Sequence, residues 1–272
     1  MDRELPLISP EKTARLNGFL DPCWVPIVEK NTRILITGAT GGLGRALVAM
    51  LQKGSDVVVG AHGGSKDFDT SGAKNIIGFV RRLRTEQDCI STVDAFVEKV
   101  GGIDALVCLN GRLTKTDHWD TLSGKEWEDD IQDNLNTPFF LARAALRYMK
   151  RQETGGNIIL NGTESALHGG SAQSFAYAIA KRGTEALVQG LAREGAPYGI
   201  RVNGVRMGYI KSGFHERWAG KDTPTLEARA KMIPMKRGGE PEEAAALFTY
   251  LLSGWSKFIS GQMFSITGGD WL

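Results

Sequence analysis

The sequence predicts a single doubly wound α/β domain, in which helices cover both faces of a parallel sheet. From residue 33 onward, short β-branched runs alternate with longer segments whose apolar residues recur at helical spacing. The length of 272 residues, with 42% hydrophobic and 24% charged residues, suits one large domain with a sizeable core. Such alternation implies parallel strands whose carboxyl ends share one edge, where ligands of these sheets bind.

The strands and helices follow one another in a regular order. Strands are predicted for RILITG at 33–38, DVVVGA at 56–61, KNIIGFV at 74–80, DALVCLNG at 104–111, NIILNG at 157–162 and IRVNGVRMG at 200–208. Apolar periodicity predicts helices over 44–52, 89–100, 125–151 and 175–195. Residues 1–32 contain several prolines and precede this alternation, so they are expected to form an N-terminal extension packed on the outside of residues 33–272 or on a neighbouring subunit.

Composition narrows the classes of partner and compartment. The 33 basic and 31 acidic residues are spread along the chain and give a formal net charge of +2, which argues against nucleic acid and membrane surfaces. No segment approaches the roughly 20 apolar residues of a membrane span, and the first residues lack the apolar run of a signal peptide. The chain is therefore expected to be cytoplasmic. Its three cysteines have no histidine at metal-ligand spacing, which predicts reduced thiols and no metal site: Cys23, Cys89 and Cys108.

A glycine-rich turn follows the first predicted strand. The residues TGATGGLG at 37–44 come directly after an apolar run and open a helix, which is the context that a phosphate-binding loop requires. Gly38, Gly42 and Gly44 would permit a tight turn, close approach of a pyrophosphate and close packing of the helix on the strand. This pattern predicts a dinucleotide site.

The end of the second strand indicates which dinucleotide is preferred. A carboxylate at this point binds the ribose hydroxyls of NAD and repels the additional phosphate of NADP. The sequence has no acid there before Asp67, and it instead places small, polar and basic residues at Ala61, His62, Ser65 and Lys66. NADP(H) is therefore favoured, with NAD(H) as the alternative.

Tyr177 and Lys181 lie four residues apart in a predicted helix and therefore on the same face. A cation near a phenol favours the charged form of the phenol, so Lys181 is expected to lower the pKa of Tyr177 and make it a proton donor. The same spacing also fits an ordinary amphipathic helix, and it is the position downstream of the strand at 157–162 that favours catalysis.

With these motifs in place, the chain resembles the short-chain dehydrogenase/reductase family over roughly residues 32–270. The matching segments are TGATGGLG at 37–44, GGIDALVCLNG at 101–111, NLNTPFF at 134–140, YAIAK at 177–181, GIRVNGVRMGYIKSG at 199–213, GEPEEAAALFTYLLS at 239–253 and ISGQMFSITGG at 259–269. The resemblance implies a Rossmann-type domain, a nicotinamide cofactor, and hydride transfer between a carbonyl and an alcohol. It also implies that Tyr177 exchanges the proton and that Lys181 holds the nicotinamide ribose.

The family pattern further requires a hydroxyl residue that polarises the substrate oxygen. Thr163 is favoured by the register of its strand, and Ser165 is the alternative. Glu164 between them is either a solvated loop acid or a carboxylate that selects a polar or cationic substrate. Asn134 precedes Pro138 by four residues, so its carbonyl loses a helical partner and can hold a water, as the matching asparagine of the family does in a proton relay.

The resemblance also implies a set of cofactor contacts. They are Gly38, Thr40, Gly42, Leu43, Gly44, His62, Asn110, Gly111, Tyr177, Lys181, Gly208, Ile210 and Ser212. The NNAG motif of the family is replaced by Cys108-Leu109-Asn110-Gly111, so other side chains must pin the centre of the sheet. Arg82 stands near the position of the family's adenine-site aspartate, where it can stack on adenine or meet a phosphate.

The remaining expectations concern the substrate and assembly. Residues 213–237 are expected to form a lid over a small-molecule carbonyl or alcohol substrate, with Phe214, His215 and Trp218 lining it. The predicted helices 125–151 and 176–195 are expected to pair subunits into a homodimer or homotetramer. A non-catalytic dinucleotide-binding regulatory protein is the alternative function, and an intact Tyr/Lys pair disfavours it. An enoyl reductase is disfavoured because the Tyr/Lys spacing of that branch is absent.

Overall fold

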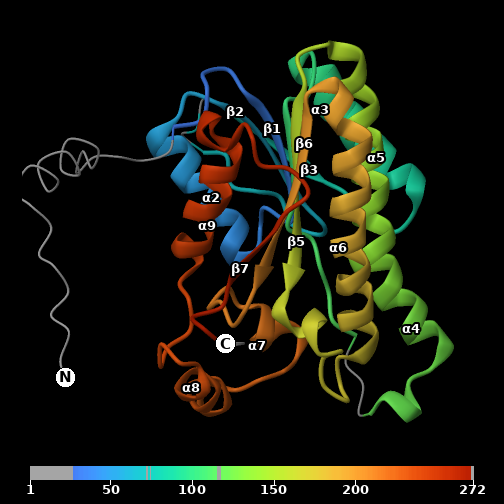
Figure 1. Cartoon of the computed structure of the whole chain (residues 1–272), viewed down its shortest axis with the longest axis vertical. Coiled ribbons are helices and arrows are strands. Elements are labelled where there is room, and N and C mark those ends of the chain that lie inside the picture. The colour runs from blue at the N-terminus through green and yellow to red at the C-terminus, as the bar shows by residue number, and fades with distance from the viewer. Residues whose placement is uncertain (1–26, 72, 74, 115–117, 271–272) are drawn as a thin grey trace, which may run out of the picture.

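The structure is a computed structural model that describes residues 27–71, 73, 75–114 and 118–270. In these residues seven strands form one parallel sheet in the order β3-β2-β1-β4-β5-β6-β7 (Figure 1). The strands are β1 Arg33–Thr37, β2 Val58–Gly63, β3 Ile76–Val80, β4 Ala105–Cys108, β5 Gly156–Thr163, β6 Ile200–Met207 and β7 Met263–Ile266. The main helices are α2 Gly42–Gly54, α3 Glu86–Val100, α4 Gly124–Ile131, α5 Thr137–Gln152, α6 Phe175–Gly195, α7 Phe214–Trp218, α8 Thr223–Met232 and α9 Pro241–Leu252.

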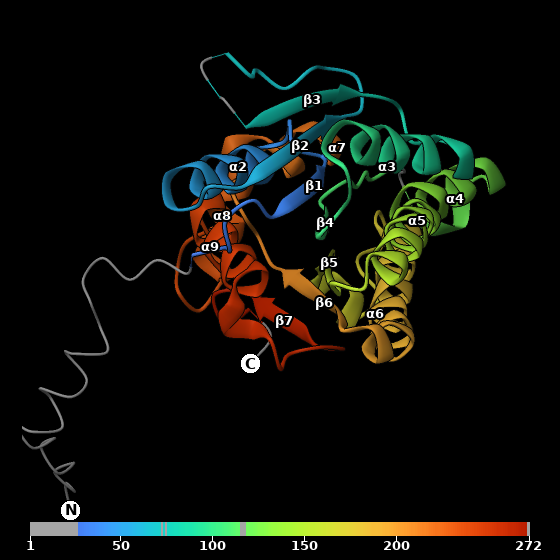
Figure 2. The ribbon, with the colours of Figure 1, turned by 90° about the horizontal axis from the view of Figure 1, so that it is seen from above.

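Helices cover both faces of the sheet, which confirms the predicted doubly wound, Rossmann-type architecture. Figures 1 and 2 show α2 and α9 on one face and α3, α5 and α6 on the other. Alternate residues of β1 explain this arrangement. Ile34 and Ile36 belong to the core on the α2 and α9 side, whereas Leu35 belongs to the core on the α3, α5 and α6 side. A strand buried on both faces reads as a continuous apolar run, as RILIT does.

Six of the strands were predicted, and the structure adds β7 at the edge of the sheet. This strand has only four residues, one of which is the exposed Ser265, so it lacks a clear apolar pattern. The predicted helix 125–151 is also interrupted. Residues Gln132–Asn136 form a π-helical turn, η2, between α4 and α5, just before Pro138 enters the first turn of α5.

The N-terminal extension is described only from Ile27 onward, and its residues 1–26 lie outside the described part of the chain. Val28 is buried in the core beside α2, and its N–H donates to the Ser55 Oγ at 3.0 Å. The Asn31 N–H donates to the Asp56 carbonyl at 2.7 Å. The end of the extension therefore packs against the sheet-and-helix domain.

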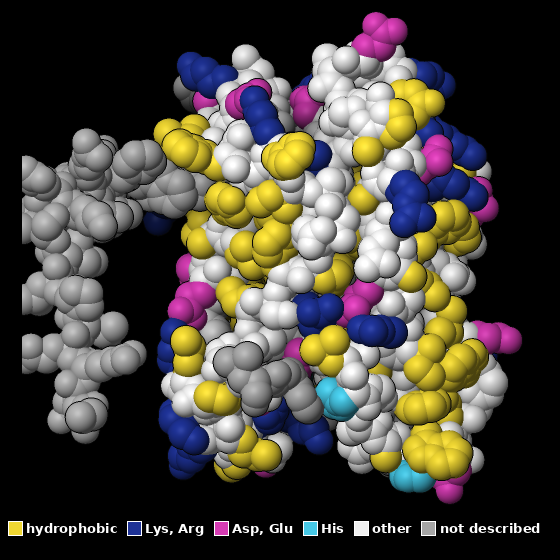
Figure 3. All heavy atoms as spheres, viewed as in Figure 1, with side chains coloured by type: hydrophobic (Ala, Val, Ile, Leu, Met, Phe, Trp, Pro, Cys, Tyr) yellow, Lys and Arg dark blue, Asp and Glu magenta, His cyan; other side chains and the backbone are white. Residues whose placement is uncertain are grey.

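The surface and the thiols match the expectations from composition. On the face in Figure 3, basic and acidic side chains are interspersed. No helix in the described ranges is long and apolar enough to cross a membrane. Cys89 and Cys108 are buried free thiols, and Cys23 lies outside the described residues.

The order of the strands reverses at β1, which pairs with β2 on one side and with β4 on the other. Connections leave β1 and β4 in opposite directions at this point, so a crevice forms beyond their carboxyl ends. A side-chain hydrogen bond joins the end of β1 to the loop after β4 at this point, because the Thr37 Oγ1 donates to the Asn110 Oδ1 at 2.7 Å. This pair supplies the connection that the missing NNAG motif leaves open.

We expect Thr37→Val to lower the free energy of unfolding by about 1–3 kcal/mol, since it leaves the Asn110 carbonyl oxygen without its donor. Chemical denaturation followed by circular dichroism measures the change. Thr249→Val is the matched control, because the buried Thr249 hydroxyl bonds only within α9, to the Ala245 carbonyl at 2.9 Å. Equal losses in the two variants would contradict a special role of the β1 to β4 bond.

Candidate active site

A cleft of about 860 Å³ opens over the carboxyl ends of the strands. It is lined by the glycine turn, by the ends of β2, β4, β5 and β6, and by α7. All predicted cofactor and lid residues line it except Lys181, which is fully buried. The predicted Asn134 is likewise fully buried and outside the lining. The structure thus brings the sequence-predicted residues together in one place.

The glycine turn is tightly packed against the loops that follow β4 and β6. Gly38 has φ of +76°, and a Cβ there would lie 2.8 Å from the Asn110 nitrogen. A Cβ on Gly42 would lie 2.5 Å from the Ser212 carbonyl oxygen. Helix α2 begins at Gly42 without a side-chain cap, and its first residues line the cleft. These features fit the phosphates of a dinucleotide.

His62 occupies the position at the end of β2 where a ribose-binding acid would stand. It is 2% exposed, and its Nε2 lies 2.8 Å from the Arg81 carbonyl oxygen. Burial lowers the pKa of His62, so the imidazole is neutral and supplies no charge to the cleft. Lys66 does not line the cleft, whereas Arg82 and Arg84 at the end of β3 do. The positive charge at this end therefore comes from β3 rather than from the residues after β2.

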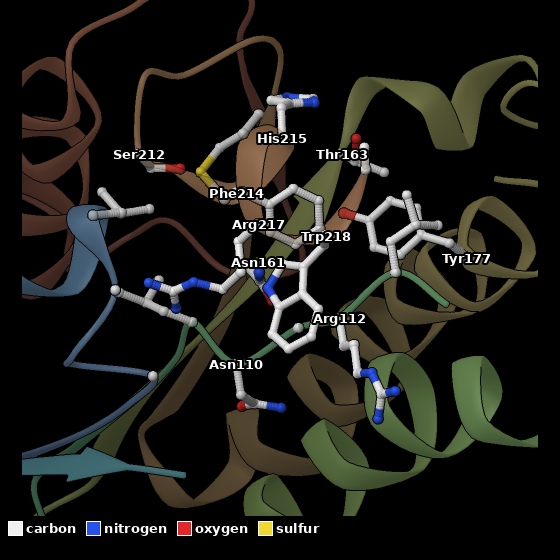
Figure 4. Close-up of a pocket in the computed structure, with 18 of the residues that line it drawn as sticks. Asn110, Arg112, Asn161, Thr163, Tyr177, Ser212, Phe214, His215, Arg217 and Trp218 are labelled. Atoms are coloured by element: carbon white, nitrogen blue, oxygen red, sulfur yellow. The ribbon is translucent and has the colours of Figure 1, made fainter. Parts of the chain in front are cut away.

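Thr163 and Tyr177 meet at one wall of the cleft. Thr163 is the last residue of β5, and its hydroxyl lies close enough to the phenol of Tyr177 to lower the pKa of the phenol. Figure 4 shows the two hydroxyls close together at one wall of the pocket. Ser165, the alternative hydroxyl, lies two residues further on, where its N–H contacts the Thr163 Oγ1 at 3.4 Å. The geometry favours Thr163 as the partner of the phenol.

The surroundings of Tyr177 correct the expected pKa shift. Burial raises the pKa of Tyr177, the negative charge of Glu164 raises it further, and the hydrogen bond with Thr163 opposes both effects. The prediction that Lys181 lowers the pKa of Tyr177 is therefore wrong for the chain by itself. The four-residue spacing predicted that the two side chains share a helix face, but it could not show how strongly burial desolvates the phenol.

Lys181 directs its ammonium to β5 rather than to the phenol oxygen. Its Nζ donates to the Asn161 Oδ1 at 2.9 Å and to the Asn161 carbonyl at 3.2 Å, and it lies 6.0 Å from the centre of the Tyr177 ring. Complete burial lowers the pKa of Lys181 to about 8. Sequence reasoning missed Asn161, although a polar residue near the end of the buried strand NIILNG was the available signal.

Asn134 binds the backbone of the loop that follows β4. Its carbonyl, in the π-helical turn, accepts a hydrogen bond from the Thr184 Oγ1 at 3.1 Å. Its side chain donates to the Arg112 carbonyl at 2.6 Å and accepts from the Arg112 N–H at 3.1 Å. A Cβ on Gly111 would lie 3.3 Å from the Asn134 Oδ1 and 3.6 Å from the Lys181 Nζ. Asn134 therefore fixes the β4 loop beside the lysine, and its freed carbonyl finds a partner in the protein.

The predicted lid residues close the other side of the cleft. The Phe214 ring lies 5.9 Å from the ring of Tyr177, and the Trp218 ring lies 5.5 Å from the guanidinium of Arg112 (Figure 4). His215 also lines the cleft, and burial lowers its pKa. Helix α7 thus carries all three residues over the phenol and the β4 loop.

The structure adds charged residues that the sequence did not single out. Arg217 of α7 extends across the pocket in Figure 4, away from Tyr177 and toward the side of the glycine turn. Arg229 of α8 lies 3.6 Å from the carboxylate of Glu164. These arginines lie on short helices whose sequences have no clear apolar periodicity, so only their place in the predicted lid hinted at a role.

Comparisons with known proteins agree with this geometry. Residues 38–270 match the family model described as enoyl-(acyl carrier protein) reductase. The chain is 31% identical over 251 residues to L-rhamnose 1-dehydrogenase (NAD(P)(+)) of Azotobacter vinelandii, covering 87% of this chain and 95% of that protein. It is 31% identical over 243 residues to a 3-oxoacyl-[acyl-carrier-protein] reductase of Thermotoga maritima, covering 86% and 96%. The crystal structure of gox2181 aligns with a TM-score of 0.78 at 25% identity, over 89% of this chain and 96% of that one.

The fold is of the Rossmann type and the relatives identify the chain as an oxidoreductase, one relative being named for its use of NAD(P)(+). The chain belongs to the short-chain dehydrogenase/reductase family, as its motifs predicted.

Asp130 provides a test of the electrostatics beneath the cleft. It is 2% exposed, its Oδ1 accepts from the Thr114 N–H at 2.8 Å, and burial raises its pKa from 3.8 to about 6. Because the pKa of Asp130 is higher in the folded state, protonation of this side chain stabilises the fold. This contribution to the free energy of unfolding is complete below pH 3.8 and is lost as the pH rises through about 6. Above that pH, a buried carboxylate opposes folding.

We expect Asp130→Asn, which keeps an acceptor oxygen, to raise the free energy of unfolding at pH 8 by about 1–3 kcal/mol and to change little at pH 4. Urea denaturation at both pH values measures the difference. Glu128→Gln is the control, since that neighbouring side chain is exposed. A gain of the same size at both pH values would show that the charge of Asp130 is not the cause.

Proposed function

We propose that the chain catalyses hydride transfer between NADP(H) and a carbonyl or secondary alcohol substrate, with Tyr177 as the proton donor and acceptor. The observation that carries the proposal is the meeting of Thr163 and Tyr177 at the wall of a cleft that also contains the glycine turn. A non-catalytic dinucleotide-binding protein would have no need for this pair of hydroxyls.

Each residue of the site has a defined part in this proposal. The Thr163 hydroxyl donates a hydrogen bond to the substrate oxygen and orients it toward Tyr177. Tyr177 gives its proton to that oxygen during reduction and takes it back during oxidation. Lys181 binds the ribose with an N–H that Asn161 does not use, and Asn134 holds the β4 loop beside it. Ser165 is the alternative hydroxyl if Thr163 proves dispensable.

The raised pKa keeps the phenol of Tyr177 protonated but makes it a weaker acid than a free phenol. It can still donate to a carbonyl oxygen, because the alkoxide that develops there is a stronger base than a phenolate. A nicotinamide cofactor supplies the hydride in this direction, and in its oxidised form it brings a positive charge that favours the phenolate needed for alcohol oxidation. Relatives support ketone or lactol chemistry through their names, although the family model carries an enoyl reductase description. The YxxxK spacing of Tyr177 and Lys181 is the reason to retain carbonyl chemistry.

The preference for NADP(H) over NAD(H) is part of the proposal. No acid stands at the end of β2, and the neutral His62 would not repel a phosphate. Ser65, Arg82 and Arg84 line this end of the cleft and would bind a phosphate on the adenosine ribose. The remaining cofactor contacts are proposed at the residues that the family pattern assigned.

Assembly and location are also proposed. The exposed apolar residues Trp127 of α4, Phe175 and Ile179 of α6 support pairing of subunits through these helices into a homodimer or homotetramer. Residues 213–237, which contain α7 and α8, are proposed as the substrate lid. A cytoplasmic location and a small-molecule substrate remain proposals that rest on composition and family.

We expect Tyr177→Phe to lower kcat by about 10²- to 10⁴-fold, because it removes the proton that the reaction transfers. Its Kd for NADPH, measured by fluorescence titration, should stay within a factor of about two, since the ring is retained. Tyr198→Phe is the control, as Tyr198 is 48% exposed and does not line the cleft. Parent-like turnover by Tyr177→Phe with a confirmed substrate would exclude the proposed mechanism.

We expect the double variant Arg82→Ala, Arg84→Ala to raise the Kd of NADPH by about 10-fold or more, with a change of less than about threefold for NADH. Isothermal titration with both dinucleotides measures this. Lys66→Ala is the matched control, because Lys66 is exposed and lies outside the cleft lining. A parent protein that binds NADH more tightly than NADPH would reverse the proposed preference.

A further inference from the structure

A buried carboxylate lies directly beside the proposed catalytic hydroxyl. Glu164 is 6% exposed and lines the cleft, and its Oε2 accepts a hydrogen bond from the Thr163 Oγ1 at 3.4 Å. The bond is long, so it can be exchanged for a stronger one. Glu164 therefore stands where the part of a substrate next to the reacting carbon would be bound.

The cation nearest to Glu164 is shared with a second acid. Arg229 of α8 lies 3.6 Å from the Glu164 Oε1, but its guanidinium binds Asp270 with both terminal nitrogens, one of them at 3.1 Å. Two carboxylates thus share one guanidinium. Asp270 holds Arg229 in the tighter bidentate geometry, and the contact of Arg229 with Glu164 is the longer one.

The wall around Glu164 is polar rather than apolar. The segment between β5 and α6 lines this part of the cleft with Ser165, His168, Ser171, Gln173 and Ser174. An alkyl chain placed against this wall would displace water from a carboxylate and several polar side chains and would offer them no hydrogen bond in return, which is costly. A substrate that carries hydroxyl groups would replace the lost water, since a hydroxyl donates well to a carboxylate.

We propose that Glu164 is a specificity residue that accepts a hydrogen bond from a hydroxyl group on the carbon adjacent to the reacting carbon, so that the substrate is a polyhydroxylated compound such as a sugar or polyol. This inference rests on the proposed oxidoreductase function. When a substrate hydroxyl donates to Glu164, the Thr163 hydroxyl is released from Glu164 and can donate to the reacting oxygen. Substrates without the adjacent hydroxyl leave Thr163 bound to Glu164 and are poorly polarised.

The test compares pairs of substrates that differ in one hydroxyl next to the reacting carbon. The pairs are 2-hydroxycyclohexanone with cyclohexanone, hydroxyacetone with acetone, and, in the oxidative direction, D-glucose with 2-deoxy-D-glucose. The full-length protein is assayed with NADPH or NADP⁺ by the absorbance of the nicotinamide. We expect kcat/KM to favour the hydroxylated member by about 10-fold or more, and Glu164→Gln to reduce that ratio by about 10-fold.

Controls separate selection from folding and from the lid. Glu216→Gln is the matched control, because it removes an exposed carboxylate of α7 that does not line the cleft, so the substrate ratio should be preserved. Glu164→Asp keeps the charge and should retain part of the ratio if Glu164→Gln fails to fold. An unchanged ratio in a folded Glu164→Gln, or an equal loss in Glu216→Gln, overturns the proposed role of Glu164.

The same experiment distinguishes failure of the inference from failure of the proposed function. Turnover of cyclohexanone and acetone at rates equal to or above those of their hydroxylated partners overturns the substrate class and leaves hydride transfer standing. Absence of turnover for every member, together with absence for a 3-oxoacyl ester and an aliphatic aldehyde, overturns both. Turnover confined to the hydroxylated members supports the inference.

Discussion

Burial of the Lys181 ammonium is the constraint on which the arrangement of the site depends. Taking a cation out of water is costly unless its N–H groups find acceptors. Asn161 provides both of its oxygens, at 2.9 and 3.2 Å, which requires the end of β5 to lie beside the middle of α6. Within the described part of the chain, Asn161 accepts from two of the three N–H groups of the ammonium. The third N–H can bind a ligand in the cleft. Burial also lowers the pKa of Lys181 to about 8, so an anionic or hydroxyl-rich ligand that restores its solvation is favoured.

The π-helical turn at Gln132–Asn136 connects this constraint to the sheet. Pro138 has no N–H, so the carbonyl of Asn134, four residues earlier, loses its donor within the helix. In the wider π-helical turn, this carbonyl and the Asn134 side chain bond to other segments instead. Thr184 of α6 takes the carbonyl, and the loop after β4 takes the side-chain amide. A local break in one helix thereby joins α6, the β4 loop and, through Thr37 and Asn110, the centre of the sheet.

The sequence predicted most of the architecture because buried parallel strands and amphipathic helices carry strong periodic patterns. It missed β7, a four-residue edge strand whose pattern is too short, and it read α4, η2 and α5 as one helix because an apolar stripe continues across the turn. In the site, spacing predicted that Tyr177 and Lys181 lie on one face of α6, and the strand register favoured Thr163 over Ser165. Spacing gave the wrong sign for the pKa of Tyr177, since desolvation depends on everything packed around the phenol. Contacts between distant segments, such as Asn161 with Lys181 and Arg229 with Glu164, cannot be read from local sequence, even where a single residue stands out as polar in a buried strand.

Charge is distributed unevenly along the cleft, and this unevenness determines what each end can bind. The basic residues in the described lining are Arg82, Arg84, Arg112, Arg217, Lys221 and Arg229, whereas its acids are Asp133 and Glu164. Asp133 lies 3.8 Å from both Arg84 and Arg112, so it moderates the cationic end without changing its sign. Glu164, by contrast, lies next to Thr163, and the Arg229 guanidinium beside it also binds Asp270. The end with Arg82 and Arg84 thus suits phosphates, whereas the Glu164 carboxylate supplies acceptors for hydrogen-bond donors. Burial is the largest cause of the raised pKa of Tyr177 and the charge of Glu164 adds to it, so the carboxylate that we propose as the specificity residue also favours the protonated phenol.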